Sequence, residues 1–296
     1  MRTRDEVEIA AELAALSTAE IVSALGAQGL APLLRRAVER VARVPSGRLG
    51  RSLARFDGLI GDFGITSAAR SALTSFGVRL DVDGAAPSAG PLLVVTNHPG
   101  AYDALALLAA LRRDDVALIA ADRSFLRAMP SLGRHLVFVD DTRAFGRLAG
   151  LRRALAWLGR GGALVQFGAG AIEPDALFAP RGGDLLGAWS PGTGVLAAAA
   201  SASGASVVPA FVSGVHSARA KRLALVRWAE RRGITTIAPL IQATLPGFRD
   251  VATSVRFGDP LDPSSLGPPA THEECTTTIR AAVNRLGALP GSRSRA

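Results

Sequence analysis

Residues 92–103 read Leu-Leu-Val-Val-Thr-Asn-His-Pro-Gly-Ala-Tyr-Asp, and this stretch decides the fold that we expect. The apolar, β-branched run at 92–96 is typical of a buried strand. Pro99 and Gly100 then end the strand in a loop. A segment with helical periodicity of its apolar residues begins at Asp103. The stretch therefore predicts one strand-to-helix unit of an α/β protein.

His98 and Asp103 lie five residues apart on this predicted turn. In such a turn the carboxylate can reach the imidazole, fix its tautomer and stabilise the imidazolium. The second ring nitrogen is then free to take a proton from a hydroxyl or an amine. The same spacing also fits a plain surface or helix-cap pair, in which Asp103 is only a negative charge that the helix dipole favours. The spacing alone leaves both interpretations open.

The rest of the chain continues the alternation of strands and helices. We predict strands at 78–82, 92–96, 116–120, 135–139, 163–167, 206–212, 234–243 and 253–257, and helices at 103–113, 147–159, 193–203, 217–232 and 271–287. This alternation predicts an α/β fold with a mixed, largely parallel sheet that is flanked by helices. We expect this α/β domain to span 78–288 and the tail at 289–296 to be disordered.

Residues 1–77 are expected to form an all-helical N-terminal region. The predicted helices are 5–24, 29–43, 49–61 and 66–76, and Pro45-Ser46-Gly47 is expected to break the second from the third. The region is amphipathic and rich in arginine. It fits a helical cap packed on the α/β domain, and it also fits a basic surface that docks on anionic lipid.

The charge balance restricts the partners. The chain has 296 residues, and 34 Lys and Arg against 25 Asp and Glu give a formal net charge of +9. Such a charge suits anionic membrane surfaces, acidic carrier proteins, the phosphates of coenzyme A or nucleic acid. A nucleic-acid-binding module is poorly supported, because no zinc finger, heptad repeat or aromatic platform accompanies the charge.

A few residues bear on the expected cellular compartment and on metal binding. The single cysteine, Cys275, excludes an intramolecular disulfide and a cysteine-rich metal site. His135, His216 and His272 lack the paired spacing of metal ligands, so we expect no metal. The start of the chain lacks the apolar core of a signal peptide, and no segment resembles a membrane span. These features predict a cytoplasmic protein, which could lie peripherally on the inner face of the cell membrane.

The stretch Asn97-His98-Pro99-Gly100-Ala101-Tyr102-Asp103 resembles the His-x4-Asp block of the glycerolipid (lysophospholipid) acyltransferase superfamily. The resemblance implies that His98 is a general base, that Asp103 orients it, and that Asn97 belongs to the substrate site. It also implies an acyl-CoA or acyl carrier protein as co-substrate, a lipid acceptor, a role in phospholipid biosynthesis and no bound cofactor. The likeness covers roughly 78–262.

Two further blocks resemble the family less closely. Residues 121–141 resemble the second block, in which a helix is followed by a strand that ends in Asp and commonly Arg. Here Asp141 stands where that arginine is expected and Arg143 follows two residues later. Arg143 is therefore either a substrate-binding group or an ordinary surface arginine. Residues 206–212 resemble the fourth block, in which a proline follows a valine-rich strand.

The third block departs from the usual Phe-Pro-Glu-Gly-Thr-Arg form. Residues 168–174 are more similar to the Gly-Gly-Ala-x-Glu block of the diacylglycerol-acyltransferase-like branch, with Gly170 and Glu173 at the matching positions. Backbone N–H groups of such a turn could face a phosphate or an oxyanion, and the carboxylate could hold an acceptor hydroxyl. A plain turn with a solvated glutamate fits the same residues.

Ile172 occupies the position of the arginine that the family associates with the acceptor phosphate. A phosphate usually needs a guanidinium fork. A neutral alcohol, an amine or another lyso-lipid is therefore the better acceptor, unless Arg181 supplies the charge. We expect an acyltransferase; the alternative is a catalytically weak lipid- or acyl-binding protein with the same fold.

Overall fold

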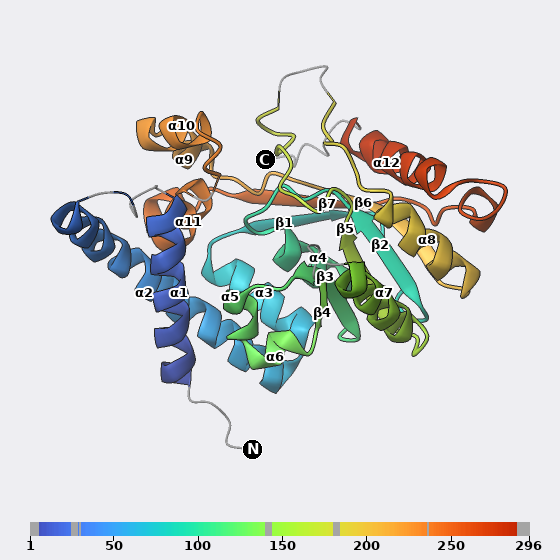
Figure 1. Ribbon diagram of the computed structural model, residues 1–296, viewed down its shortest axis with the longest axis horizontal. Coiled ribbons are helices and arrows are strands. Elements are labelled where there is room, and N and C mark those ends of the chain that lie inside the picture. Colours follow the sequence, from blue (N-terminus) through green and yellow to red (C-terminus); the bar gives the residue numbers. More distant parts are fainter. Residues whose placement is uncertain are drawn as a thin grey trace.

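The computed structural model describes residues 6–24, 29, 31–139, 144–179, 184–235 and 237–288. A seven-stranded sheet with the strand order β1-β7-β6-β2-β5-β3-β4 forms its centre (Figure 1). The strands are β1 Arg79–Asp83, β2 Leu92–Thr96, β3 Val116–Ala121, β4 Leu136–Val139, β5 Ala163–Phe167, β6 Ser206–Ser213 and β7 Ala252–Phe257. Neighbouring strands pair in parallel, except that β6 and β7 are antiparallel. The predicted α/β fold with a mixed, largely parallel sheet is confirmed.

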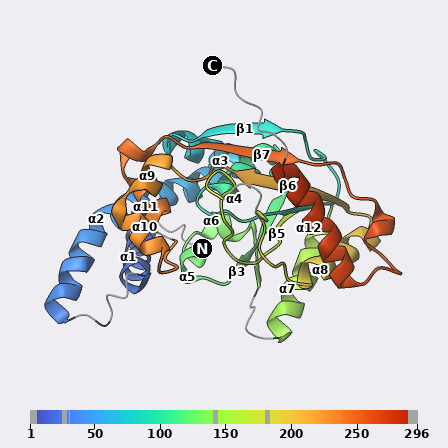
Figure 2. The ribbon, with the colours of Figure 1, turned by 90° about the horizontal axis from the view of Figure 1, so that it is seen from above.

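Helices cover both faces of the sheet (Figure 2). They are α1 Glu6–Ala24, α2 Pro32–Phe63, α3 Ile65–Ser75, α4 Asp103–Leu111, α5 Ser124–Arg127, α6 Pro130–Gly133, α7 Ala144–Leu158, α8 Gly192–Ala202, α9 Ala218–Arg222, α10 Ala224–Glu230, α11 Ile237–Thr244 and α12 His272–Ala288. Short 3₁₀ turns lie at Pro246–Phe248 and Pro263–Ser265. Helices α1 to α4 share one apolar core with the sheet, and α7, α8 and α12 share the other.

Strand β2 contributes to both cores. Leu92 and Val94 point into the core under α1 to α4, whereas Leu93 and Val95 point into the core under α7, α8 and α12. Successive side chains of a strand alternate between faces, so a strand covered on both faces is apolar at every position. This explains why the run at 92–96 shows no polar alternation.

Helix α2 is continuous, so the predicted break at Pro45-Ser46-Gly47 is wrong. Pro45 removes one helical hydrogen bond. Buried small residues nevertheless recur every fourth position on both sides of it, at Ala42, Ser46, Gly50 and Ala54. Positions four apart share one helix face. The packing of this face holds the helix together across the proline.

Two predictions in the second half of the chain are also wrong. The segment 234–243 is not a strand, because α11 begins at Ile237. Pro239 could not donate a hydrogen bond in a sheet, but it is tolerated in the first turn of a helix. The single helix predicted at 217–232 is divided into α9 and α10 at Leu223, whose backbone is extended.

The predicted tail at 289–296 lies outside the described residues. In the described ranges, no helix is both long enough and apolar enough to cross a membrane.

Candidate active site

The carboxyl end of β2 lies between two parallel neighbours. Thr96 is in register with Phe167 of β5 on one side and with Ala210 of β6 on the other. Open α/β sheets bind ligands beyond the carboxyl ends of such strands. The loop from Asn97 to Tyr102 leaves the sheet at this edge.

This loop folds back so that His98 and Asp103 meet. Gly100 and Ala101 have left-handed backbone angles, with φ of 84° and 51°. The Oδ2 atom of Asp103 lies 2.7 Å from Nδ1 of His98 and also accepts the N–H of Gly100 at 2.7 Å. Its Oδ1 atom accepts the N–H of Ala104 at 2.6 Å. Asp103 is the first residue of α4, so it forms the imidazole pair and also provides a negative charge at a helix N-terminus.

The pair combines a buried carboxylate with a partly open imidazole. The Asp103 side chain is 2% exposed, and the His98 side chain is 27% exposed. An ionised carboxylate only accepts hydrogen bonds, so Nδ1 carries the proton and Nε2 is the basic nitrogen. The imidazole stacks on the ring of Phe167, with 4.1 Å between centroids. The ring is thus held in one orientation, as a general base requires.

Asn97 connects β2 to β6. The side chain is fully buried, and its Nδ2 donates to the carbonyl of Val212 at 2.8 Å while its Oδ1 accepts the N–H of Val212 at 2.7 Å. The amide therefore occupies the place of a backbone pair just beyond the end of β2. Asn97 fixes where the His98 loop begins.

Glu173 holds the same loop from the other side. Its Oε2 accepts the backbone N–H of His98 at 2.9 Å, and its own N–H donates to the carbonyl of His98 at 2.7 Å. Its Oε1 accepts the N–H of Gly187 at 2.8 Å and the indole N–H of Trp189 at 3.0 Å. Both carboxylate oxygens are thus engaged by protein donors, although Glu173 also borders the cavity described below.

The glycine turn after β5 also uses its backbone donors internally. The N–H of Gly168 donates to the carbonyl of Thr96 at 2.8 Å, and the N–H of Gly170 donates to Phe167 at 3.1 Å. Gly170 is left-handed, with φ of 65°. The structure thus brings Asn97, Glu173 and Gly170 close to the pair by contacts along this sheet edge. Arg143 and Arg181 lie outside the described residues.

A second histidine–aspartate pair lies beside the first. Asp175 is buried; its Oδ1 accepts the N–H of Gly214 at 2.8 Å, and its Oδ2 lies 3.4 Å from Nδ1 of His216. Burial by itself raises the pKa of Asp175, but His216 and the backbone N–H groups of Gly214 and Leu177 outweigh it and hold that pKa below its usual value. Sequence reasoning missed this pair. From the sequence, His216 was considered only as a metal ligand, and Asp175 was not singled out.

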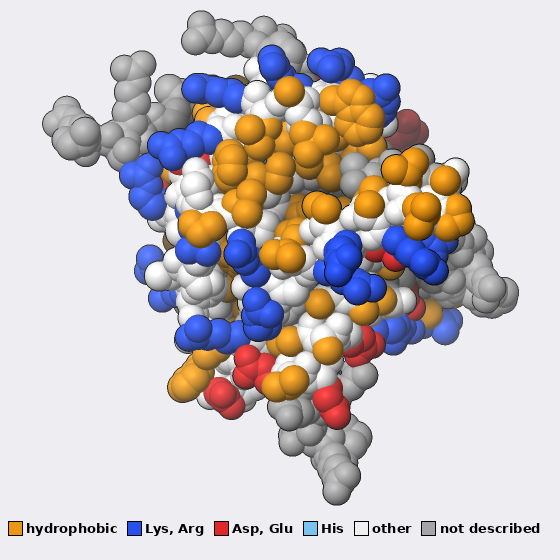
Figure 3. Space-filling view, turned by 90° about the vertical axis from the view of Figure 1, so that its left-hand side faces the viewer, with side chains coloured by type: hydrophobic (Ala, Val, Ile, Leu, Met, Phe, Trp, Pro, Cys, Tyr) orange, Lys and Arg blue, Asp and Glu red, His pale blue; other side chains and the backbone are white. Residues whose placement is uncertain are grey.

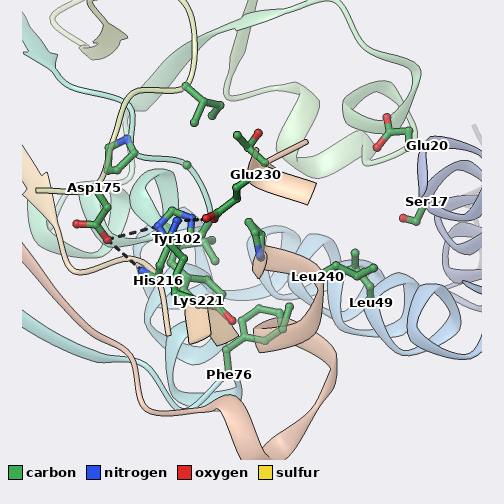
Figure 4. A pocket seen from close by; sticks show the side chains of 18 of the residues that line it. Ser17, Glu20, Leu49, Phe76, Tyr102, Asp175, His216, Lys221, Glu230 and Leu240 are labelled. Carbon is green, nitrogen blue, oxygen red and sulfur yellow. Dashed lines mark hydrogen bonds and ion pairs between the residues drawn. The ribbon is translucent and has the colours of Figure 1, made fainter. Parts of the chain in front are cut away.

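A cavity of about 610 Å³ opens next to the His98 loop. This volume is in the range of ordinary ligand pockets. Its walls come from α1, α2, the loops after β2, β5 and β6, and α9 to α11 (Figure 4). The apolar lining consists of Ile21, Leu49, Leu53, Phe76, Leu105, Phe125, Ile172, Pro239, Leu240 and Ala243. Pro99 and Gly100 line it directly, which places the turn between His98 and Asp103 at its wall.

Tyr102 forms part of the same wall. The side chain is buried, and its hydroxyl has no hydrogen-bond partner of good geometry among the described residues. Burial raises the pKa of the phenol well above its usual value, and the nearby Arg249 and Gln242 oppose only part of that effect. Tyr102 is therefore a neutral hydroxyl at neutral pH. No group of three or more potential metal ligands occurs within the described ranges.

Neither a scan of protein-family models nor a search of curated proteins finds a match. Among solved structures, the chain is similar to the 1-acyl-sn-glycerophosphate (LPA) acyltransferase PlsC from Thermotoga maritima, with 19% identity over 81% of this chain and 80% of that chain and a TM-score of 0.47. At this level of similarity, we base the function on the geometry of the site.

Proposed function

We propose that this protein is an acyltransferase, which moves a fatty acyl group from acyl-CoA or acyl carrier protein to a hydroxyl or amine of a lipid acceptor. One observation carries this proposal: His98 and Asp103 form a 2.7 Å pair on a turn that lines a largely apolar cavity. The cavity suits an aliphatic chain, and the imidazole suits the removal of a proton from the acceptor.

The reaction needs one base and no acyl-enzyme. Nε2 of His98 takes the proton as the acceptor oxygen or nitrogen attacks the thioester carbonyl. The new C–O or C–N bond forms, the C–S bond breaks, and the imidazolium gives its proton to the departing thiolate. Asp103 stabilises the imidazolium between these two transfers. The sequence contains no Gly-x-Ser-x-Gly nucleophile motif, in agreement with direct transfer.

Asn97 and Glu173 act as positioning residues in this scheme. Each binds backbone or indole groups around the His98 loop, and neither has a carboxylate or amide atom left without a protein partner. They fix the loop that carries the base. In this proposal the Glu173 carboxylate holds the His98 loop in place, whereas from the sequence it could have held an acceptor hydroxyl.

The first half of α2 favours an anionic lipid surface as a partner. It projects from the body of the protein (Figures 1 and 2), and Leu33, Leu34, Val41 and Val44 on it are between 58% and 78% exposed. Exposed arginines alternate with them at 35, 36, 40 and 43. Apolar side chains that enter a lipid layer and cations that meet its head groups are the features of an interfacial helix. A lipid acceptor could reach the cavity from such a surface.

The test is thioester turnover by the full chain. Purified protein is given long-chain acyl-CoA or acyl carrier protein together with a mixed extract of polar and neutral lipids, while thiol release and new acylated lipids are followed by mass spectrometry. We expect thiol release that matches the formation of one acylated product. Lipid binding without any thiol release would instead identify the protein as a lipid- or acyl-binding protein.

A further inference from the structure

The charge of the cavity is opposite to that of the whole protein. The chain carries a formal net charge of +9 and 33 arginines. Of the described residues that line the cavity, none is an arginine and Lys221 is the one cation, whereas Glu20, Glu173, Asp175 and Glu230 are carboxylates. Lys221 against the four carboxylates gives these five side chains a formal charge of −3. A basic protein thus has an acidic lining around this apolar cavity.

The four carboxylates differ in what neutralises them. Glu173 and Asp175 are buried and accept backbone N–H groups, so their charges are fixed parts of the wall. Glu230 is bound by Lys221, with 2.5 Å between Oε1 and Nζ, which balances both charges. Glu20 forms no ion pair with a described residue. The excess negative charge is therefore not cancelled by the only lysine of the chain.

Polar groups gather at two ends of the cavity (Figure 4). Tyr102, His216 and Lys221 lie at the end that adjoins the His98 loop, and Ser17 and Glu20 lie on α1 at the opposite end. The hydroxyls of Tyr102 and Ser17 are buried and lack a hydrogen-bond partner among the described residues. Buried polar groups normally have such a partner. These hydroxyls are available to hydrogen-bond to polar groups of a molecule that enters the cavity.

We propose that the acyl acceptor carries an ammonium group rather than a phosphate, and that the net negative charge of the lining selects it. This inference rests on the proposed acyltransferase function and names its acceptor class. The carboxylates of the lining compensate the positive charge of an ammonium group that enters the cavity. A phosphate would meet the same carboxylates without an arginine fork among the described lining residues.

The test compares three single-chain lipids that share the same alkyl chain and a free hydroxyl but differ in the head: an amino alcohol, an uncharged diol and a glycerol phosphate. We expect kcat/KM to be at least about 10-fold higher for the amino alcohol than for the phosphate, the scale of one charge-assisted contact. The net charge of +9 by itself favours the opposite order. A preference for the phosphate, or equal use of the amino alcohol and the diol, would overturn the inference.

Substitutions in the cavity lining test whether its charge causes the preference for the amino alcohol. Glu230→Gln removes one carboxylate and leaves Lys221 unpaired, so the preference for the amino alcohol over the phosphate should fall about 10-fold. The double variant Lys221→Gln/Glu230→Gln keeps the net charge of the lining and should restore most of the preference. Glu8→Gln alters an exposed carboxylate of α1 that does not line the cavity and should change nothing. An unchanged preference in Glu230→Gln contradicts the assignment.

A binding measurement separates this inference from the proposed function. The same three lipids are titrated calorimetrically against the full chain in the absence of an acyl donor. If none of the lipids is acylated but the amino alcohol binds most tightly, the acyltransferase proposal fails and the inference about the head group stands. If acylation occurs and the phosphate lipid binds most tightly, the reverse holds.

Discussion

At the scale of single residues, the account depends on the pairing of Asp103 with His98. In Asp103→Asn the side chain keeps its size but no longer holds the proton on Nδ1 as a charged acceptor does. We expect kcat for acyl transfer to fall about 10²- to 10⁴-fold with little change in KM. Steady-state kinetics on the full chain tests this. A kcat within a few-fold of the wild type would show that Asp103 is only a helix-terminal charge.

The variant Asn97→Ala tests the structural role of this side chain through stability, without a measurement of catalysis. Asn97→Ala leaves the buried N–H and carbonyl of Val212 without partners. We expect the free energy of unfolding in urea to fall by about 1–3 kcal/mol. Asn284→Ala, on a less buried position of α12, serves as the matched control and should lose less. Equal losses in the two variants would contradict the bridge between β2 and β6.

Asp175 predicts a pH dependence of stability. Its pKa is lower in the folded protein than its ordinary value of 3.8, so the stability it contributes is complete above the unfolded pKa and is lost as the pH falls through the folded pKa. Asp175→Asn should therefore melt well below the wild type near neutral pH, and the gap should narrow below about pH 4. Melting temperatures across this range give the measurement, and a gap that stays constant would be inconsistent with the shift.

The two histidine pairs show what the sequence can predict at this scale. His98 and Asp103 are separated by five residues on one turn, so a local pattern was enough to bring them together. Asp175 and His216 are 41 residues apart, and they meet because the loops after β5 and β6 leave the same sheet edge. Glu173 was singled out from the sequence, but its role as a support of the His98 loop depends on contacts to Gly187 and Trp189 that no local pattern encodes.

At the scale of elements, the crossing of α1 and α2 depends on Gly50. A Cβ atom at Gly50 would lie 2.5 Å from the carbonyl oxygen of Ala10, whereas a Cβ atom at Gly58 of the same helix meets nothing within 4 Å. Gly50→Ala should therefore destabilise the protein by about 1–3 kcal/mol, and Gly58→Ala should stabilise it by about 0.5–1 kcal/mol. Urea unfolding of both variants gives the comparison, and a stabilised Gly50→Ala would contradict the close approach.

An element could be predicted where local sequence decides its structure, and not where packing against a distant element decides it. Strands 92–96 and 163–167 are largely apolar because both faces are covered, and their predicted bounds match β2 and β5. The sequence predicts a break in α2 because Pro45 is a strong local breaker, whereas the packing that overrides it involves α1. The β-branched residues of 234–243 predict a strand, whereas tertiary packing of Ile237 and Ala238 favours a helix.

At the scale of the whole molecule, the cavity opens on a face where apolar side chains surround a hollow and arginine and lysine side chains border it (Figure 3).

Contact between α2 and lipid can be tested by substitution. The variant Leu33→Ser/Val41→Ser should bind anionic vesicles at least about 10-fold more weakly, because two exposed apolar side chains are lost. Leu225→Ser, on α10, is the control. Vesicle co-sedimentation at two salt concentrations gives the measurement, and higher salt should weaken binding. Binding that is equal in both variants would exclude α2 as the contact.

The central claim is that His98 removes a proton from an acyl acceptor at the edge of this cavity. The most direct measurement is the initial rate of acyl transfer by the wild type, by His98→Ala and by His272→Ala, which alters an exposed histidine at the start of α12. The account predicts that His98→Ala loses at least about 100-fold while His272→Ala keeps the wild-type rate. A His98→Ala variant that folds, binds lipid and transfers acyl groups at the wild-type rate would contradict it.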